Sequence, residues 1–106
     1  MRVLFDQGTP VPLRLFLTNC EVTTAAQQGW DRLQNGDLIQ AAEDAGFDIF
    51  LTTDKNIRYH QNLTRRRIAV VLIGKQQWPE LRDHVSLVLS ALSAAVPGSY
   101  SEVDIP

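Results

Sequence analysis

Short strand-like segments that alternate with helical segments are the feature of this sequence that most limits its fold. The strand-like segments are rich in apolar or β-branched residues, and the run at 2–5 is apolar without alternation, which is typical of a parallel strand covered on both faces. The helical segments carry apolar residues at helical spacing. Strands are expected at 2–5, 20–24, 47–52 and 68–73, and helices at 11–17, 37–45, 56–62 and 79–95. This alternation predicts an α/β layered fold with a mainly parallel sheet of four to five strands.

The length and the hydrophobic content of the chain predict one small domain over residues 1–106. The length is 106 residues, and the hydrophobic share of 44% is too high for a disordered chain. The segment at 97–106 is rich in Pro, Ser and Gly and is expected to form a loose tail. Residues 25–34 have roughly helical spacing, but Gly29 weakens any helix there.

Charge, cysteine content and hydropathy indicate which partners and which cell compartment to expect. The formal net charge is −2, so a nucleic-acid partner needs a local basic patch rather than a global field. One cysteine, Cys20, allows no internal disulfide, which suits a reducing cytoplasm. The longest apolar run, 68–73, is far shorter than the roughly 20 residues that span a bilayer. We expect a cytoplasmic protein without a signal peptide or a membrane contact.

Two aspartates follow predicted strands and form the candidate site. Asp6 comes directly after the first strand, and Asp54 follows the strand at 47–52. Right-handed crossovers bring the carboxyl ends of parallel strands to the same edge of the sheet, where ligands bind, so the two carboxylates are expected to converge. Carboxylates held together need a compensating cation, and hard oxygen ligands favour Mg²⁺ or Mn²⁺. Such an ion can activate water for attack on a phosphodiester.

Acidic residues of the mid-chain helix are further candidates. Asp37 and Glu43 lie six positions apart, which leaves them about 120° apart around the helix axis, so they cannot face one centre equally well. Asp37, at the start of the helix, is the better candidate for the sheet edge, although an N-cap role is an equal alternative. Glu43 is more typical of a solvated helix residue.

Basic residues near Asp54 are candidates for contacts with nucleic acid. Lys55 and Arg58 follow Asp54 and could form a rim where RNA approaches. Arg65 and Arg66 belong to a run of three arginines that could contact phosphates. The alternative for this run is a solvated turn before the next strand.

Three short motifs occur in order along the chain: Val-Leu-Phe-Asp6, Asn-Gly-Asp37-Leu-Ile and Thr-Thr-Asp54-Lys-Asn. Together they resemble the compact PIN-like domains, a short and largely bacterial branch of the PIN nuclease superfamily, and the match spans about residues 1–74. The resemblance implies a three-layer α/β/α fold, Mg²⁺ or Mn²⁺ bound by Asp6, Asp37 and Asp54, and RNA cleavage. It also implies a possible role as the toxin of a toxin–antitoxin pair, with a small antitoxin partner and possible homodimers.

Two departures from the family pattern leave alternatives open. Relatives commonly have a second acid where this chain has Gln7, and another acid where it has Asn56. Both replacements remove negative charge, so a catalytically degenerate PIN-like module that binds a partner protein is the alternative. A phosphotransfer receiver-like domain also has strand-end aspartates and a lysine near the position of Lys75, but Gln7 breaks its acidic pair.

Overall fold

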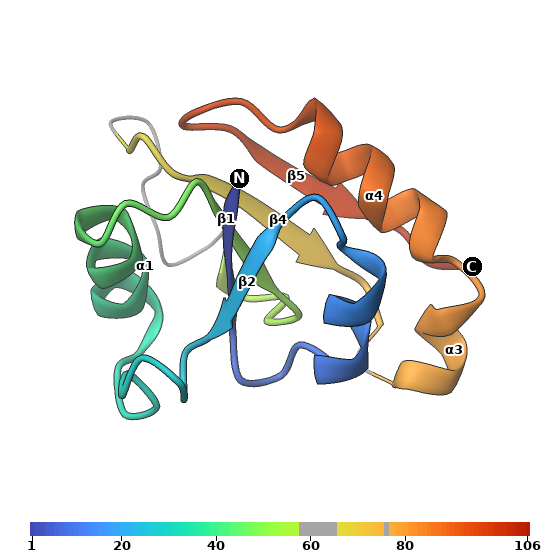
Figure 1. The fold of residues 1–106 in the computed structure, drawn as a ribbon, viewed down its shortest axis with the longest axis horizontal. Coiled ribbons are helices and arrows are strands. Elements are labelled where there is room, and N and C mark those ends of the chain that lie inside the picture. The colour runs from blue at the N-terminus through green and yellow to red at the C-terminus, as the bar shows by residue number, and fades with distance from the viewer. Residues whose placement is uncertain (58–65, 76) are drawn as a thin grey trace.

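A five-stranded parallel sheet forms the centre of the computed structural model, which describes residues 1–57, 66–75 and 77–106 (Figure 1). The strand order is β2-β1-β3-β4-β5, and every pairing between neighbours is parallel. The predicted α/β fold with a mainly parallel sheet is therefore confirmed. The strands are β1 (Arg2–Phe5), β2 (Glu21–Thr24), β3 (Ile49–Thr52), β4 (Ala69–Ile73) and β5 (Tyr100–Val103).

Helices cover both faces of the sheet because the central strands are apolar on both sides. Along β1, Val3 and Phe5 join the hydrophobic cluster on one face, whereas Leu4 joins the cluster on the other. Leu81 and Val88 pack in the first cluster, so the helices that carry them lie on that face (Figure 1). The result is a three-layer arrangement. The first face carries the 3-10 helix η1 (Val11–Phe16), α3 (Trp78–Arg82) and α4 (Val85–Ala94), and the other face carries α1 (Asn35–Asp44).

The last predicted helix differs from the sequence expectation. The single helix expected at 79–95 is wrong, because α3 and α4 are separated at His84, whose φ of −125° is not helical. Leu81, Val85, Val88 and Leu92 are nevertheless all buried, so the apolar stripe predicted from the spacing continues across the break. Within the described part of the chain, no helix is long and apolar enough to cross a membrane.

Residues 25–34 form turns rather than a helix. Gly29 adopts a φ of +78°, a left-handed conformation that glycine tolerates and that does not continue a helix. The Trp30 ring packs edge-on against Phe47, with the centroids 6.2 Å apart. This segment crosses from β2 to the start of α1 and lies beside the carboxyl edge of β1, where its residues line hollows shared with Asp6.

The loose tail expected at 97–106 is wrong, because this segment contributes the edge strand β5. Gly98 takes a φ of +78° in the turn that leads to it. Val103 and Ile105 then alternate into the core, where both are buried. The burial of two apolar side chains favours an ordered strand over a tail despite the Pro, Ser and Gly content before it. Most of the helix expected at 56–62 lies outside the described residues.

Candidate functional site

The strand order places Asp6 and Asp54 at the topological switch point of the sheet. β1 and β3 are neighbours in the sheet. The connection after β1 leads to β2 on one side, whereas the connection after β3 leads to β4 on the other side. In open parallel sheets, ligands bind outside the carboxyl ends of the strands at such a point. Asp6 follows β1 and donates its backbone N–H to the Leu51 carbonyl of β3 at 2.9 Å. The two aspartates therefore end adjacent strands at the same edge.

The Thr52 hydroxyl connects the two aspartates. Its Oγ1 donates a hydrogen bond to Asp6 Oδ2 at 2.7 Å and accepts one from the backbone N–H of Asp54 at 3.1 Å. Thr52 is fully buried, so water has little access to this hydroxyl. The Asp6 carboxylate and the Asp54 backbone thus share one hydroxyl group, as expected for residues at the same edge. The Asp54 carboxylate bonds to Asn56 instead, so a meeting of the two carboxylates stays a prediction.

Gln7 ties the Asp6 side of the site to the loop between β2 and α1. Its backbone N–H donates to Asp6 Oδ1 at 2.7 Å, and its side-chain Nε2 donates to the Asp31 carbonyl at 2.5 Å. Asp6, Gln7 and Asp31 line a hollow of about 470 Å³ together with Arg32 and Gln34. Asp31 is a second carboxylate beside Asp6 that the sequence reasoning missed. No strand end or motif marks it, since the turns of the loop bring it there.

Asp54 lines a different hollow of the same edge. Its Oδ1 accepts the backbone N–H of Asn56 at 3.0 Å. The hollow measures about 450 Å³, and its charged lining residues are Asp54, Lys55, Lys75 and Glu80. Lys75, which the phosphotransfer alternative requires near the aspartates, pairs with Glu80 at an N–O distance of 3.3 Å.

Asp37 does not complete a three-carboxylate centre with the other two aspartates. It lies exposed in the first turn of α1. Gln34 and Leu38 line the hollow that contains Asp6, but Asp37 is not one of its lining residues. Among the residues that the structure describes, no group of three or more His, Cys, Asp or Glu side chains is arranged to hold a metal ion.

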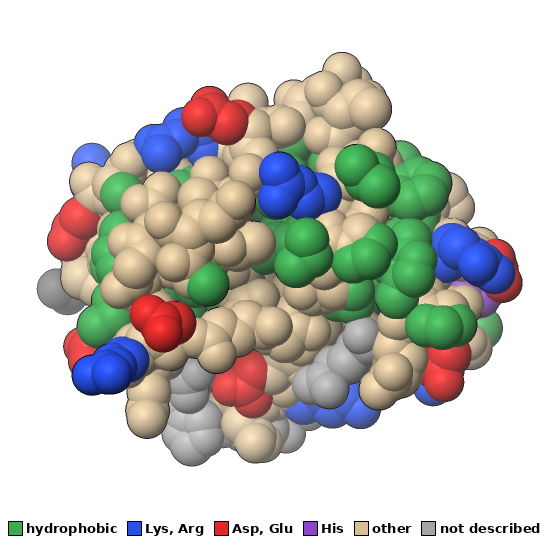
Figure 2. Space-filling view, turned by 60° about the horizontal axis from the view of Figure 1, so that its bottom comes forward, with side chains coloured by type: hydrophobic (Ala, Val, Ile, Leu, Met, Phe, Trp, Pro, Cys, Tyr) green, Lys and Arg blue, Asp and Glu red, His purple; other side chains and the backbone are tan. Residues whose placement is uncertain are grey.

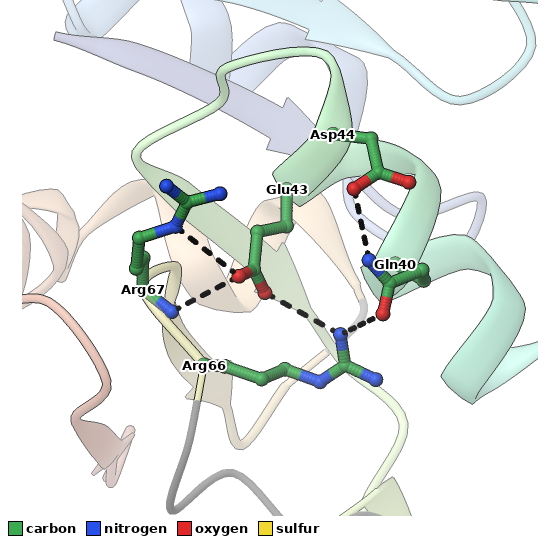
Figure 3. A network of polar contacts seen from close by, with 5 residues as sticks. All are labelled: Gln40, Glu43, Asp44, Arg66 and Arg67. Carbon is green, nitrogen blue, oxygen red and sulfur yellow. Dashed lines mark hydrogen bonds and ion pairs between the residues drawn. The ribbon is translucent and has the colours of Figure 1, made fainter.

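Glu43 and Arg66 lie at the opposite, amino edge of the sheet, where they form an ion-pair network (Figure 3). Arg66 precedes β4, and its Nη1 donates to Gln40 Oε1 at 3.0 Å and to Glu43 Oε2 at 3.4 Å. Arg67 donates its backbone N–H to Glu43 Oε1 at 3.3 Å. Arg66 is therefore separated from Asp54 by the length of a strand, and Glu43 joins α1 to the start of β4 instead of pointing into solvent.

The remaining basic candidates divide between described and undescribed residues. Lys55 is exposed and lines the hollow of Asp54, and its role in an RNA-facing rim stays a prediction. Arg58 and Arg65 lie outside the described residues.

In comparisons with known proteins, no family model matches the chain, and no match was found among curated proteins or solved structures. The fold and the site therefore define the class, a parallel α/β protein with paired aspartates at the switch point of its sheet. The PIN-like resemblance stays a prediction from three sequence motifs.

Proposed function

We propose that the protein is a metal-dependent endoribonuclease of the PIN-like type, with Asp6 and Asp54 as its central carboxylates. The observation that carries the proposal is the Thr52 hydroxyl, which joins both residues at the switch point. A role as the toxin of a toxin–antitoxin pair belongs to the same proposal. Residues placed by partly buried hydrogen bonds at the carboxyl edge of the sheet support a prearranged site.

The donor set is chemically compatible with Mg²⁺ or Mn²⁺. Mg²⁺ is usually bound through one or two carboxylates, with water and substrate phosphates filling the other positions. Asp6 accepts two hydrogen bonds from the protein, and a carboxylate offers about four lone-pair positions, so acceptor capacity is left for an ion. When bound by Asp6 and Asp54, the ion supplies Lewis acidity and a more acidic bound water.

The chain's own residues have separate roles in this proposal. Thr52 holds the Asp6 carboxylate and the Asp54 backbone in register. Gln7 holds the loop at Asp31 against the site. Asp37 is the candidate for orienting water from the first turn of α1. Lys55, exposed beside Asp54, is the candidate for contacting the RNA backbone.

Cleavage of single-stranded RNA in the presence of Mn²⁺ tests the proposal. We expect the wild-type protein to cleave and Asp6→Asn to lose activity by about 100-fold or more, because the variant removes a carboxylate charge from the site. Asp37→Asn should lose less. The matched control is Asp44→Asn, an exposed aspartate near the end of α1 that bonds to Gln40. Cleavage retained in Asp6→Asn would exclude this assignment.

A catalytically degenerate module that binds a partner protein is the second candidate. Large apolar side chains stay exposed on and after two helices of one face, at Val11, Leu15 and Phe16 of η1, Leu87 and Leu89 of α4, and Val96. Figure 2 shows hydrophobic side chains gathered on one part of the surface. Contiguous exposed apolar surface is typical of protein-binding sites. The side-chain amide of Gln7, bound to Asp31, also stands where a second acid is expected.

Thermal unfolding with millimolar Mn²⁺ separates the two candidates. A ligand that binds the folded state raises the melting temperature by mass action. The nuclease proposal expects a rise in the wild-type protein that Asp54→Asn abolishes. The degenerate module expects no rise in either protein.

A further inference from the structure

We propose that Lys55 and Lys75 form a binding subsite for a backbone phosphate of single-stranded RNA. The inference rests on the proposed nuclease function and extends its substrate contacts to Lys75. The chain contains two lysines, which stand 20 positions apart, and both line the hollow that contains Asp54. A phosphate held there would lie beside a proposed catalytic carboxylate.

The parallel sheet explains why the two lysines meet. β3 and β4 are neighbours, with Thr52 opposite Leu72 in the register. Lys55 follows β3 after two residues, and Lys75 follows β4 after Gly74. Both side chains therefore start from the carboxyl edge, and the described hollow of about 450 Å³ lies between them.

The ion pair of Lys75 is one that a phosphate can replace. The Lys75 and Glu80 side chains are 42% and 53% exposed, and their charged atoms are 3.3 Å apart. Exposed pairs of this kind contribute little because water and salt screen them. Lys55 and Lys75 line the same hollow, and each adds a positive charge that attracts a phosphate there. Glu80 thus holds Lys75 in place until a stronger anion enters.

Among the described residues, the arginine candidate for phosphate contact is bound elsewhere. Arg66 is bound by Glu43 and Gln40 at the amino edge, and its side chain is 18% exposed. A phosphate beside Asp54 cannot use a guanidinium at the opposite end of β4. Among the described residues that line the hollow, Lys55 and Lys75 are the cations.

Fluorescence anisotropy with a labelled 12-nucleotide single-stranded RNA tests the subsite. The measurement is made in EDTA, so that no cleavage occurs and no metal contributes. We expect Lys75→Met and Lys55→Met each to weaken binding by about tenfold at low salt. Each should lower the slope of log affinity against log salt by about 0.7, the value for one phosphate contact on a single strand. The matched control is Arg14→Gln, an exposed loss of the same charge on η1.

Glu80→Gln is a second kind of variant, and we expect it to change RNA affinity in the opposite direction. It frees Lys75 from its carboxylate partner and should tighten RNA binding by about twofold to fivefold. Lys75→Arg should keep most of the affinity. Melting temperatures close to the wild-type value show that each variant is folded.

Two results overturn the subsite: a wild-type protein that does not bind the oligonucleotide, and lysine variants that bind as tightly as Arg14→Gln. Lysine-dependent binding without Mn²⁺-dependent cleavage would reject the nuclease function and retain the subsite. Cleavage that depends on Asp6 but on neither lysine would do the reverse.

Discussion

The two edges of the sheet use the same kinds of charged residue in different ways. At the amino edge, charges pair across elements, and the pair of Glu43 with Arg66 is largely buried (Figure 3). At the carboxyl edge, Asp6 and Asp54 are joined through a threonine hydroxyl and line open hollows. The comparison shows that side-chain type alone does not separate a structural charge from a candidate ligand. The two roles are separated by the edge of the sheet at which the residue lies and by the partner that it binds there.

Arg2 illustrates how completely the amino edge uses its polar groups. Its backbone N–H donates to Asp48 Oδ2 at 2.8 Å, and its Nη1 donates to the Ala45 carbonyl at 2.6 Å. The guanidinium also lies over the Phe47 ring, 4.3 Å from the centroid. The backbone and side chain of this one residue thereby connect the end of α1 with the starts of β1 and β3. We expect substitutions at this edge to change stability, and substitutions at the carboxyl edge to change ligand binding.

Glu43→Ala is expected to have the largest effect on stability. The Glu43 side chain is 11% exposed, and its removal leaves the Arg66 guanidinium, 18% exposed, without its carboxylate. Unpairing a partly buried charge should lower the free energy of unfolding by about 2 kcal/mol. For a domain of this size, the melting temperature falls by about 10 °C. Urea unfolding followed by circular dichroism measures the change.

Arg67→Ala is the matched control for Glu43→Ala. Its side chain contacts the same carboxylate at 3.6 Å but is 84% exposed, so the loss should stay below about 0.5 kcal/mol. The rise in melting temperature caused by Mn²⁺ should be equal in the wild type and both variants. If Glu43→Ala removed that rise, the division of roles between the two edges would be wrong.

Thr52→Val is expected to affect both stability and ligand binding. The variant keeps the shape of the side chain but removes the hydroxyl, which leaves Asp6 Oδ2 and the Asp54 N–H without this partner. We expect a loss of about 1.5 kcal/mol in the free energy of unfolding. The Mn²⁺-induced rise in melting temperature should also disappear, because the Asp6 carboxylate is no longer held in place. Thermal unfolding with and without Mn²⁺ measures both effects.

Thr52→Ser and Thr53→Val complete the test of the bridge. The serine keeps the hydroxyl and should restore the response to Mn²⁺. Thr53 is buried next to Thr52, and its substitution should leave that response intact. An unchanged response in Thr52→Val would show that the bridge serves stability alone.

The sequence was sufficient for strands β1 to β4 and for the placement of Asp6 and Asp54 at one edge. Apolar runs identify buried strands, and parallel strands bring Asp6 and Asp54 to one edge without any knowledge of packing. It was insufficient where long-range contacts decide the outcome. β5 forms because Val103 and Ile105 fill the core beside β4, a contact that local composition does not reveal.

The candidate site shows the same limit. Glu43 looked like a solvated helix residue because its partners Arg66 and Arg67 come from another element. Asp31 has no local signal, since its place beside Asp6 depends on the loop that Gln7 anchors. Position at the end of a strand predicted that Asp6 and Asp54 lie at one edge, whereas the motif that contains Asp37 did not bring that residue to the same hollow.

Gln7→Glu is expected to have the smallest effect on stability and tests why the two edges differ. Glutamate cannot donate to the Asp31 carbonyl, and it adds a negative charge beside Asp6. Because residue 7 is exposed, we expect a loss of only about 0.5 kcal/mol in the absence of metal. The added carboxylate should increase the rise in melting temperature caused by Mn²⁺ and lower the concentration that produces half of it. Gln7→Ala, which also breaks the loop contact but adds no charge, is the control. Equal responses to Mn²⁺ in the Glu and Ala variants would mean that a missing acid at position 7 does not limit ion binding. The contact between Gln7 and the loop at Asp31 would then decide whether the carboxyl edge binds an ion.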